Sequence, residues 1–83
     1  IGTAYPNPGN PAMVLPLEVP APSDIAISLY DIRGRKQRDI LEAFYAPGDY
    51  RITLDLSGIP SGVYVLQVRS AGGIGRQKIL LMK

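Results

Sequence analysis

The sequence contains no cysteine and no histidine among its 83 residues. These absences exclude disulfides, the common zinc sites and the nucleophile–base pairs that use Cys or His. An enzyme without these residues needs paired carboxylates or an activated lysine in a cleft, and a domain this small seldom forms a deep one. We therefore expect a protein that is not an enzyme and that uses no cofactor.

The chain also lacks a large excess of either charge and any long apolar run. The formal net charge is +2, and nucleic-acid binding requires a basic stripe that this chain lacks, so no nucleic-acid partner is expected. No stretch approaches the ~20 apolar residues that span a bilayer, which predicts no transmembrane segment. We expect no signal peptide within this sequence, whose first residue is Ile1, not Met. We expect one module of a larger protein.

The chain does contain enough apolar residues to form a folded core. Hydrophobic residues make up 46% of it and charged residues 19%, which is a globular composition. The length predicts that residues 1–83 form a single domain near the small end of the range, where folding buries roughly 60–65% of the unfolded surface.

Apolar residues alternate with other residues in four stretches, which predicts β-strands. Pro16 lies in the first stretch, and because proline cannot donate to a ladder, that strand should lie at a sheet edge or bulge there. Residues 36–45 are expected to form a further strand, although Ile40, Leu41 and Phe44 also fit a short helix. The alternating apolar residues are Met13, Leu15, Leu17 and Val19; Ile25, Ile27 and Leu29; Tyr50, Ile52, Leu54 and Leu56; and Tyr64, Leu66 and Val68.

Turn residues separate these stretches. Asp31 and Gly34 predict a tight hairpin turn, in which Asp31 bonds the turn's own backbone and Gly34 takes a positive φ. Residues 1–11 hold three prolines and are expected to form an ordered loop that Tyr5 anchors to the core. Six or seven short strands, with turns about every 8–12 residues, predict an all-β fold, an antiparallel β-sandwich.

The C-terminal stretch is apolar on both faces. Ile79, Leu80, Leu81 and Met82 follow one another between basic residues. Ile79 and Leu81 are expected to close the core, which leaves Leu80 and Met82 outside, where a purely structural strand would carry polar residues. Exposed apolar side chains on a terminal strand suit docking or strand addition to a partner, and they are compatible with a strand-mediated homodimer.

Four motifs follow one another along nearly the whole chain. Their residues are Tyr5, Pro6, Asn7 and Pro8; Asp31, Gly34 and Arg35; Gly62 and Tyr64; and Lys78, Ile79, Leu80, Leu81, Met82 and Lys83. In this order they resemble the type A C-terminal sorting domain of proteins exported by the type IX secretion system. The chain is also similar to the related immunoglobulin-like domain of flagellar hook-capping proteins. It departs from the family at Gly9, where an aromatic residue is common.

The resemblance implies an immunoglobulin-like β-sandwich that carries no reaction of its own. Such a domain directs a covalently linked N-terminal passenger through the periplasm and the type IX machinery of a Gram-negative bacterium. In the family a surface sortase commonly removes the domain, so the implied location is secreted or at the cell surface. The implied signal is the stretch from Lys78 to Lys83, whereas the other motif residues are expected to be mainly structural.

A basic cluster also has two interpretations. It consists of Arg33, Arg35, Lys36 and Arg38. The cluster is either a solvated hairpin tip, diluted by nearby acidic residues, or an electrostatic handle for lipopolysaccharide or an acidic partner.

Carboxylates and aromatic residues suggest two further candidate sites. Asp49 and Asp55 could contribute to a calcium site, but no ligand-dense loop accompanies them. A sugar-stacking platform could be built from Tyr30, Phe44, Tyr45 and Tyr50, although Phe44 and Tyr50 are expected in the core. Such a platform would suit the alternative function, an accessory carbohydrate-binding module or structural spacer of a secreted glycosidase.

Overall fold

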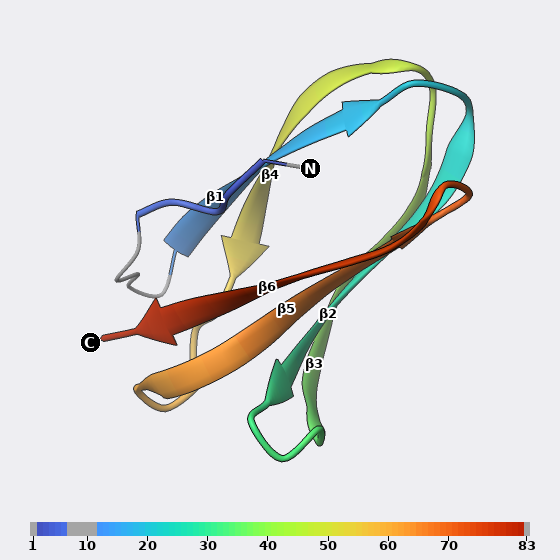
Figure 1. The fold of residues 1–83 in the computed structure, drawn as a ribbon. Coiled ribbons are helices and arrows are strands. Elements are labelled where there is room, and N and C mark those ends of the chain that lie inside the picture. The colour runs from blue at the N-terminus through green and yellow to red at the C-terminus, as the bar shows by residue number, and fades with distance from the viewer. Residues whose placement is uncertain (1, 7–11, 83) are drawn as a thin grey trace.

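The computed structural model describes residues 2–6 and 12–82, and within these ranges the fold is all-β, which confirms the predicted class. Figure 1 shows two antiparallel sheets that face each other in a sandwich. The strands are β1 (Ala12–Val19), β2 (Ser23–Asp31), β3 (Lys36–Tyr45), β4 (Gly48–Asp55), β5 (Gly62–Ser70) and β6 (Gly73–Leu81).

The strands divide unequally between the two sheets. β1 pairs with β4 in a two-stranded sheet, and the four-stranded sheet has the order β3-β2-β5-β6. The chain passes from one sheet to the other after β1, after β3 and after β4. β6 therefore lies at an edge of the larger sheet, in continuous antiparallel register with β5.

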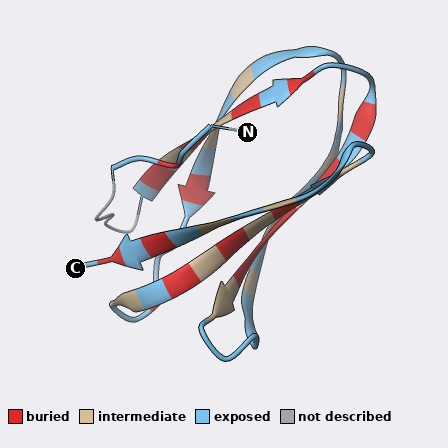
Figure 2. Ribbon diagram, viewed as in Figure 1, coloured by how far each residue is buried: buried red, intermediate tan, exposed pale blue. Residues whose placement is uncertain are grey.

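Apolar side chains from both sheets fill the space between them (Figure 2). The period-two patterns predicted this core, except that Tyr50 and Ile52 are only partly buried and pack against its margin. Each full burial of such a side chain contributes about 1.5–3 kcal/mol relative to exposure. The largest fully buried side chains are Met13, Leu15, Ile25, Ile27, Leu29, Leu54, Leu56, Leu66, Ile79 and Leu81.

Residues 36–45 form β3, so the strand prediction is confirmed and the helical alternative is wrong. Two register shifts interrupt the pairing of β3 with β2. Tyr45 packs against the core, and because successive side chains of a strand point to opposite faces, Phe44 points outward. Phe44 is 64% exposed, so the expectation that it joins the core was wrong.

The N-terminal segment, residues 2–6, runs antiparallel beside β1. Tyr5 and Val14 exchange both main-chain hydrogen bonds, at 2.9 and 2.7 Å, and the Tyr5–Pro6 peptide bond is cis. Ala4 is the residue that faces the core, at 1% exposure. Its neighbour Tyr5 points to the opposite side and is 46% exposed, so the expectation that Tyr5 anchors this loop in the core was wrong.

Pro16 fits into β1 because its missing N–H faces the N-terminal segment and not β4. The N–H and C=O of one strand residue point to the same side, and the Pro16 carbonyl accepts from the Gly2 N–H at 3.0 Å. The ladder with β4 therefore loses no donor, and the predicted edge position of this strand is confirmed. A Cβ at Gly2 would lie 2.9 Å from the Cβ of Pro16, so this close approach requires glycine.

Candidate functional site

β6 separates a buried face from an exposed face along the C-terminal stretch. Ile79 and Leu81 are 1% and 0% exposed, whereas Leu80 and Met82 are 37% and 55% exposed. The predicted division into inward and outward side chains is therefore confirmed for these four residues. Lys83, the last residue of the predicted signal, lies outside the described residues.

The outward side chains of β6 adjoin those of β5. Leu80 is the register partner of Val63, and Lys78 is the partner of Val65. Such partners share one face of the sheet, with about 4.5–5.5 Å between their Cβ atoms. We call Val63, Val65, Leu80 and Met82 the outer apolar patch; Val63 is 40% exposed and Val65 is half-buried.

Basic side chains border the outer apolar patch. Lys78 is exposed beside Val65. Tyr30, the other register partner of Val65, has the Lys36 ammonium 6.0 Å from its ring centroid. Lys36 also contacts Asp39 at 2.9 Å, and this hydrogen bond raises the pKa of Lys36. Lys78, by contrast, makes no ion pair with a described residue, so the arrangement suits a partner that offers apolar groups and a negative charge beside Lys78.

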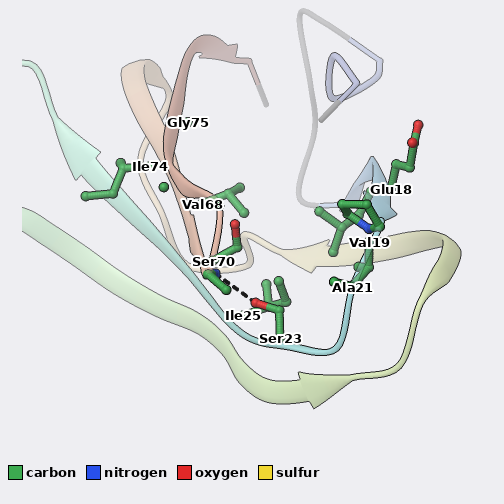
Figure 3. A pocket seen from close by; sticks show the side chains of 14 residues that line it. Glu18, Val19, Ala21, Ser23, Ile25, Val68, Ser70, Ile74 and Gly75 are labelled. Carbon is green, nitrogen blue, oxygen red and sulfur yellow. Dashed lines mark hydrogen bonds between the residues drawn. The ribbon is translucent and has the colours of Figure 1, made fainter.

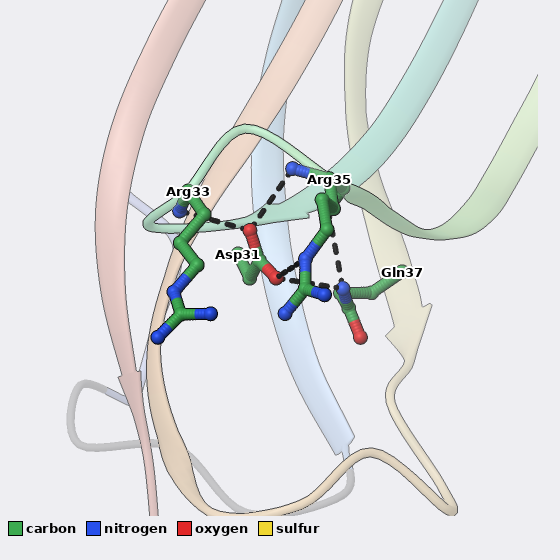
Figure 4. A network of polar contacts seen from close by, with 4 residues as sticks. All are labelled: Asp31, Arg33, Arg35 and Gln37. Carbon is green, nitrogen blue, oxygen red and sulfur yellow. Dashed lines mark hydrogen bonds and ion pairs between the residues drawn. The ribbon is translucent and has the colours of Figure 1, made fainter.

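Asp31 holds the turn between β2 and β3 together (Figure 4). Its Oδ1 accepts from the main-chain N–H groups of Arg33 and Arg35, both at 2.9 Å. Its Oδ2 accepts from Arg35 Nε at 3.0 Å and from Gln37 Nε2 at 3.2 Å. The pKa of Asp31 is lowered, and the largest cause is the main-chain hydrogen bond from Arg35. Gly34 has a φ of 85°, so the predicted turn chemistry is observed.

The basic cluster is largely neutralised by neighbouring carboxylates. Arg35, Lys36 and Arg38 each have a nitrogen within 4.0 Å of an aspartate oxygen. Arg33 makes no ion pair with a described residue, and Figure 4 shows its guanidinium directed away from Asp31. The geometry favours the interpretation of a solvated hairpin over that of an electrostatic handle.

Tyr64 is a core tyrosine whose hydroxyl donates to the main chain. It is 7% exposed and donates to the carbonyl of Pro60, four residues earlier. Tyr50 repeats this arrangement by donating to the Ala46 carbonyl at 2.7 Å. A glycine precedes each tyrosine by two residues, and a Cβ at Gly62 would lie 3.5 Å from the Tyr64 ring. Tyr64 thus has a structural role at this corner, whereas a Cβ at Gly62 would make only an ordinary contact with the ring, so the available space does not require glycine there.

The proposed calcium and sugar sites are not assembled. Asp49 and Asp55 lie near opposite ends of β4, and in residues 2–6 and 12–82 no three acidic side chains gather where they could hold a metal. The rings of Tyr45 and Tyr50 meet edge to face, with centroids 4.8 Å apart and planes at 67°. Tyr30 and Phe44 lie near opposite ends of the β2–β3 pair, so the four rings do not form one platform.

Register brings three of the four motifs to one end of the larger sheet. Asp31 is the partner of Tyr64 in β5, and the other partner of Tyr64 is Ile79 in β6. The outer apolar patch lies at this same end, because Leu80 follows Ile79 directly. Of the first motif, Asn7 and Pro8 lie outside the described residues.

Gln77 is a residue whose role the sequence reasoning missed. Its Oε1 accepts from the Ala4 N–H at 2.8 Å, and its Nε2 donates to the Gly2 carbonyl at 3.0 Å. The available signal was a glutamine in phase with the inward residues Ile79 and Leu81, because a polar side chain on an inward face needs partners. No spacing rule identifies those partners, which lie at the other end of the chain.

In the described ranges the structure holds no helix long and apolar enough to cross a membrane.

Comparison with known protein families gives a match over nearly the whole chain. The model of a family described as "Secretion system C-terminal sorting domain" matches residues 3–82. No curated protein and no solved structure matches the chain significantly.

Proposed function

The chain belongs to the family of secretion system C-terminal sorting domains, and we propose that its signal is the outer apolar patch with the basic residues beside it. The domain is a non-catalytic sorting signal for type IX secretion. We assign the part of that signal that a receptor contacts to the outward-facing side chains at the end of the closing strand. The stretch concerned comprises Lys78, Ile79, Leu80, Leu81, Met82 and Lys83.

The exposure of Leu80 and Met82 is the observation that carries this proposal. Ile79 and Leu81 are committed to the core, so a folded domain cannot present them to a receptor. An apolar side chain left in water gains free energy when a partner covers it, at about 25 cal/mol per Å². Because Val63 on β5 extends the same surface, the patch is broader than a single strand.

We propose that the remaining motifs keep this surface in place. The turn at Asp31 and the tyrosine corner at Tyr64 lie in the same row of the sheet as Ile79. A disturbed turn or corner would therefore shift β5 and β6 together. This explains how residues that are not contacted by a receptor can still belong to the family's motifs.

The partners follow from this assignment. The outer apolar patch would dock on a component of the type IX machinery, and the passenger would be linked to the N-terminal side of the domain. The protein would pass through the periplasm to the surface of a Gram-negative bacterium, where a sortase could act on it. A homodimer through the same patch would compete with docking, because one surface cannot serve both contacts at once.

A reporter fusion tests the function directly. Residues 1–83 are joined to the C-terminus of a fluorescent protein that carries an export signal to the periplasm, in a host with the type IX machinery. We expect surface fluorescence that added protease removes, and periplasmic retention in the same host without the machinery. Retention in both hosts, or surface display in both, would contradict the proposed function.

A further inference from the structure

The smaller sheet has an open edge at β4. This strand pairs only with β1, in a register that runs without interruption from Val19 and Gly48 to Ala12 and Asp55. No other described strand bonds to the far side of β4. A regular strand with an open edge accepts a further strand through its main-chain groups.

Alternate residues of β4 direct their main-chain groups to the open edge. Val14 and Pro16 bond to the N-terminal segment, so their main-chain groups point away from β4. Their partners in β4 are Thr53 and Arg51, and two opposite residues of an antiparallel pair either bond to each other or both point outward. The N–H and C=O groups of Thr53, of Arg51 and, two residues earlier, of Asp49 therefore face the open edge.

The carbonyl of Asp55 shows the same direction. It accepts from Arg38 Nη1 of β3 at 2.9 Å, so the open edge of β4 lies on the β3 side of the sandwich. β6 is the outer strand at the other side of the larger sheet. Two register shifts interrupt the pairing of β3, and such bulges protect an edge from further pairing. β4 has no register shift, so it is the regular edge strand on this side.

Two carboxylates stand opposite each other near the start of β4. Glu18 is the register partner of Asp49, and both side chains are exposed. Figure 3 shows the Glu18 carboxylate directed away from the buried Ser23 and Ile25. Like charges directly opposite each other destabilise a sheet, and neither carboxylate makes an ion pair with a described residue. A cation placed beside them would relieve this repulsion.

Arg51 carries a positive charge on the same outer face. It lies two residues after Asp49, so its side chain also points outward, and it is exposed. Its partner in β1 is the uncharged Pro16, and it makes no ion pair with a described residue. A hollow of about 490 Å³ is lined by Pro16, Glu18, Asp49 and Arg51 among others. The outer face thus has room for a cationic side chain of a second molecule.

We infer that a second copy of this chain adds its β4 to this edge, antiparallel and about a two-fold axis at Tyr50. In this register Asp49 of one copy stands opposite Arg51 of the other, and the axis repeats the contact on its far side. The same two residues face the open edge with their main chains, so they also exchange both main-chain hydrogen bonds. Each arginine would lie beside Asp49 and extend over the hollow toward Glu18.

The charges select this register over its neighbours. A two-fold axis at Arg51 would set arginine opposite arginine, which is destabilising. An axis at Thr53 would set Arg51 opposite Asp55, whose carbonyl already accepts from Arg38 and whose carboxylate lies 4.0 Å from the same guanidinium. The axis at Tyr50 joins charges that lack an ion pair with a described residue.

Such a dimer would leave the outer apolar patch uncovered. The patch lies on the outer face of the larger sheet, on β5 and β6, whereas the open edge of β4 belongs to the smaller sheet and lies on the β3 side. Two patches would then be presented together, and binding of one raises the effective concentration of the other. The inference goes beyond the proposed function and does not depend on it.

Sedimentation equilibrium of purified residues 1–83 tests the inference. We expect a monomer–dimer equilibrium with a Kd of about 10 μM to 1 mM. Asp49→Arg and Arg51→Asp each set like charges opposite each other, so each should raise the Kd by about tenfold or more. An equimolar mixture of these two variants should regain the dimer, because unlike charges then meet at both positions. Asp24→Arg, which reverses an exposed charge on β2, is the matched control and should dimerise like the parent.

A chain that stays monomeric up to about 1 mM would overturn the inference. Dimerisation that survives both single reversals would overturn it as well, because the contact would then lie elsewhere. Loss of the dimer in the Leu80→Gln/Met82→Gln variant would assign the contact to the outer apolar patch and would also contradict the inference. Recovery in the mixture shows that the single variants are folded, and the reporter fusion succeeds or fails independently of these results.

Discussion

The side-chain amide of Gln77 donates from Nε2 to the main-chain carbonyl of Gly2, across 3.0 Å and 75 positions of sequence. Its Oε1 accepts from the Ala4 N–H at 2.8 Å. One side chain of β6 thereby supplies both an acceptor and a donor to the N-terminal segment, as a neighbouring strand would. The other side of that segment is bonded to β1. The segment therefore joins the two sheets along one edge of the sandwich.

Replacing Gln77 with Ala should loosen this edge. Two hydrogen bonds are lost, each worth about 0.5–1.5 kcal/mol net, so the free energy of unfolding in urea should fall by about 1–3 kcal/mol. The Ala4 amide should exchange faster. Gln67→Ala is the matched control, because Gln67 lies on β5 and its Oε1 accepts from exposed Arg76. An equal loss in both variants would mean that Gln77 does not act through the N-terminal segment.

Tyr64→Phe should lower stability more than Tyr50→Phe. Both substitutions leave a main-chain carbonyl without its hydroxyl donor, but Tyr64 is buried and Tyr50 only half-buried. We expect a loss of about 1–2 kcal/mol for Tyr64→Phe and less than about 1 kcal/mol for Tyr50→Phe. Chemical denaturation measures both. Tyr45→Phe serves as control, since its hydroxyl makes no hydrogen bond with a described residue, and a reversed order would contradict the account.

Acid should remove the contribution of Asp31 to stability. The main-chain bond from Arg35, the largest cause, lowers the folded pKa of Asp31 below its usual 3.8. A lowered folded pKa stabilises the folded state above the unfolded value, and this stabilisation is lost as the pH falls through the folded value. Asp31→Asn should therefore have a lower Tm than the parent near pH 7, and the gap should narrow below about pH 3.8. Asp24→Asn, which removes an exposed carboxylate, should show no such gap; a gap for Asp31→Asn that stays constant down to pH 2 would refute the linkage.

Truncating the inward residues of β6 should destabilise the domain strongly. Ile79→Ala and Leu81→Ala each open a cavity at a position that is 1% or less exposed, and such changes cost about 2–5 kcal/mol. Thermal unfolding of the purified domain measures this. Leu80→Ala, on the outward face, is the control with a loss below about 1.5 kcal/mol. Similar losses for all three would mean that β6 has no inward and outward faces.

The burial of Ile79 and Leu81 changes how the signal must be tested. Deleting residues 78–83 would remove Ile79 and Leu81 from the core together with the exposed side chains. Lost export after that deletion would then report unfolding as readily as lost recognition. Single outward substitutions avoid the ambiguity.

Much of the fold could be predicted from short-range patterns. The alternation of residues 13–19, 25–29, 54–56 and 64–68 identified the buried faces, because a strand that buries one face repeats every two residues. The chemistry of Asp31 and Gly34 predicted a turn that is complete within seven residues. The division of the closing strand followed from the same period, since Ile79 and Leu81 must share a face.

Long-range pairing could not be predicted in this way. The pairing of β1 with β4 and the insertion of β2 between β3 and β5 depend on packing across the whole core, which no local pattern encodes. The predictions that Phe44 and Tyr5 are buried were wrong because they rested on the size of these side chains. The alternation of strand side chains decides instead: Tyr45 and Ala4 face inward, so their neighbours Phe44 and Tyr5 face outward. The role of Gln77 could not be predicted because its partners are main-chain atoms, which are the same whatever the residue type.

We propose that export depends on the outward face of β6, separately from the stability of the domain. The most direct test is surface display of the reporter fusion carrying Leu80→Gln and Met82→Gln, beside a control fusion carrying Ile32→Gln and Phe44→Gln. The control residues are also exposed apolar side chains, at 74% and 64%, but lie outside the patch, Ile32 on the β2–β3 turn and Phe44 near the far end of β3. Both purified double variants should unfold within about 1 kcal/mol of the parent domain. We predict that the Leu80/Met82 variant remains in the periplasm while the control reaches the surface, and export of the folded Leu80/Met82 variant at the parent level would contradict the account.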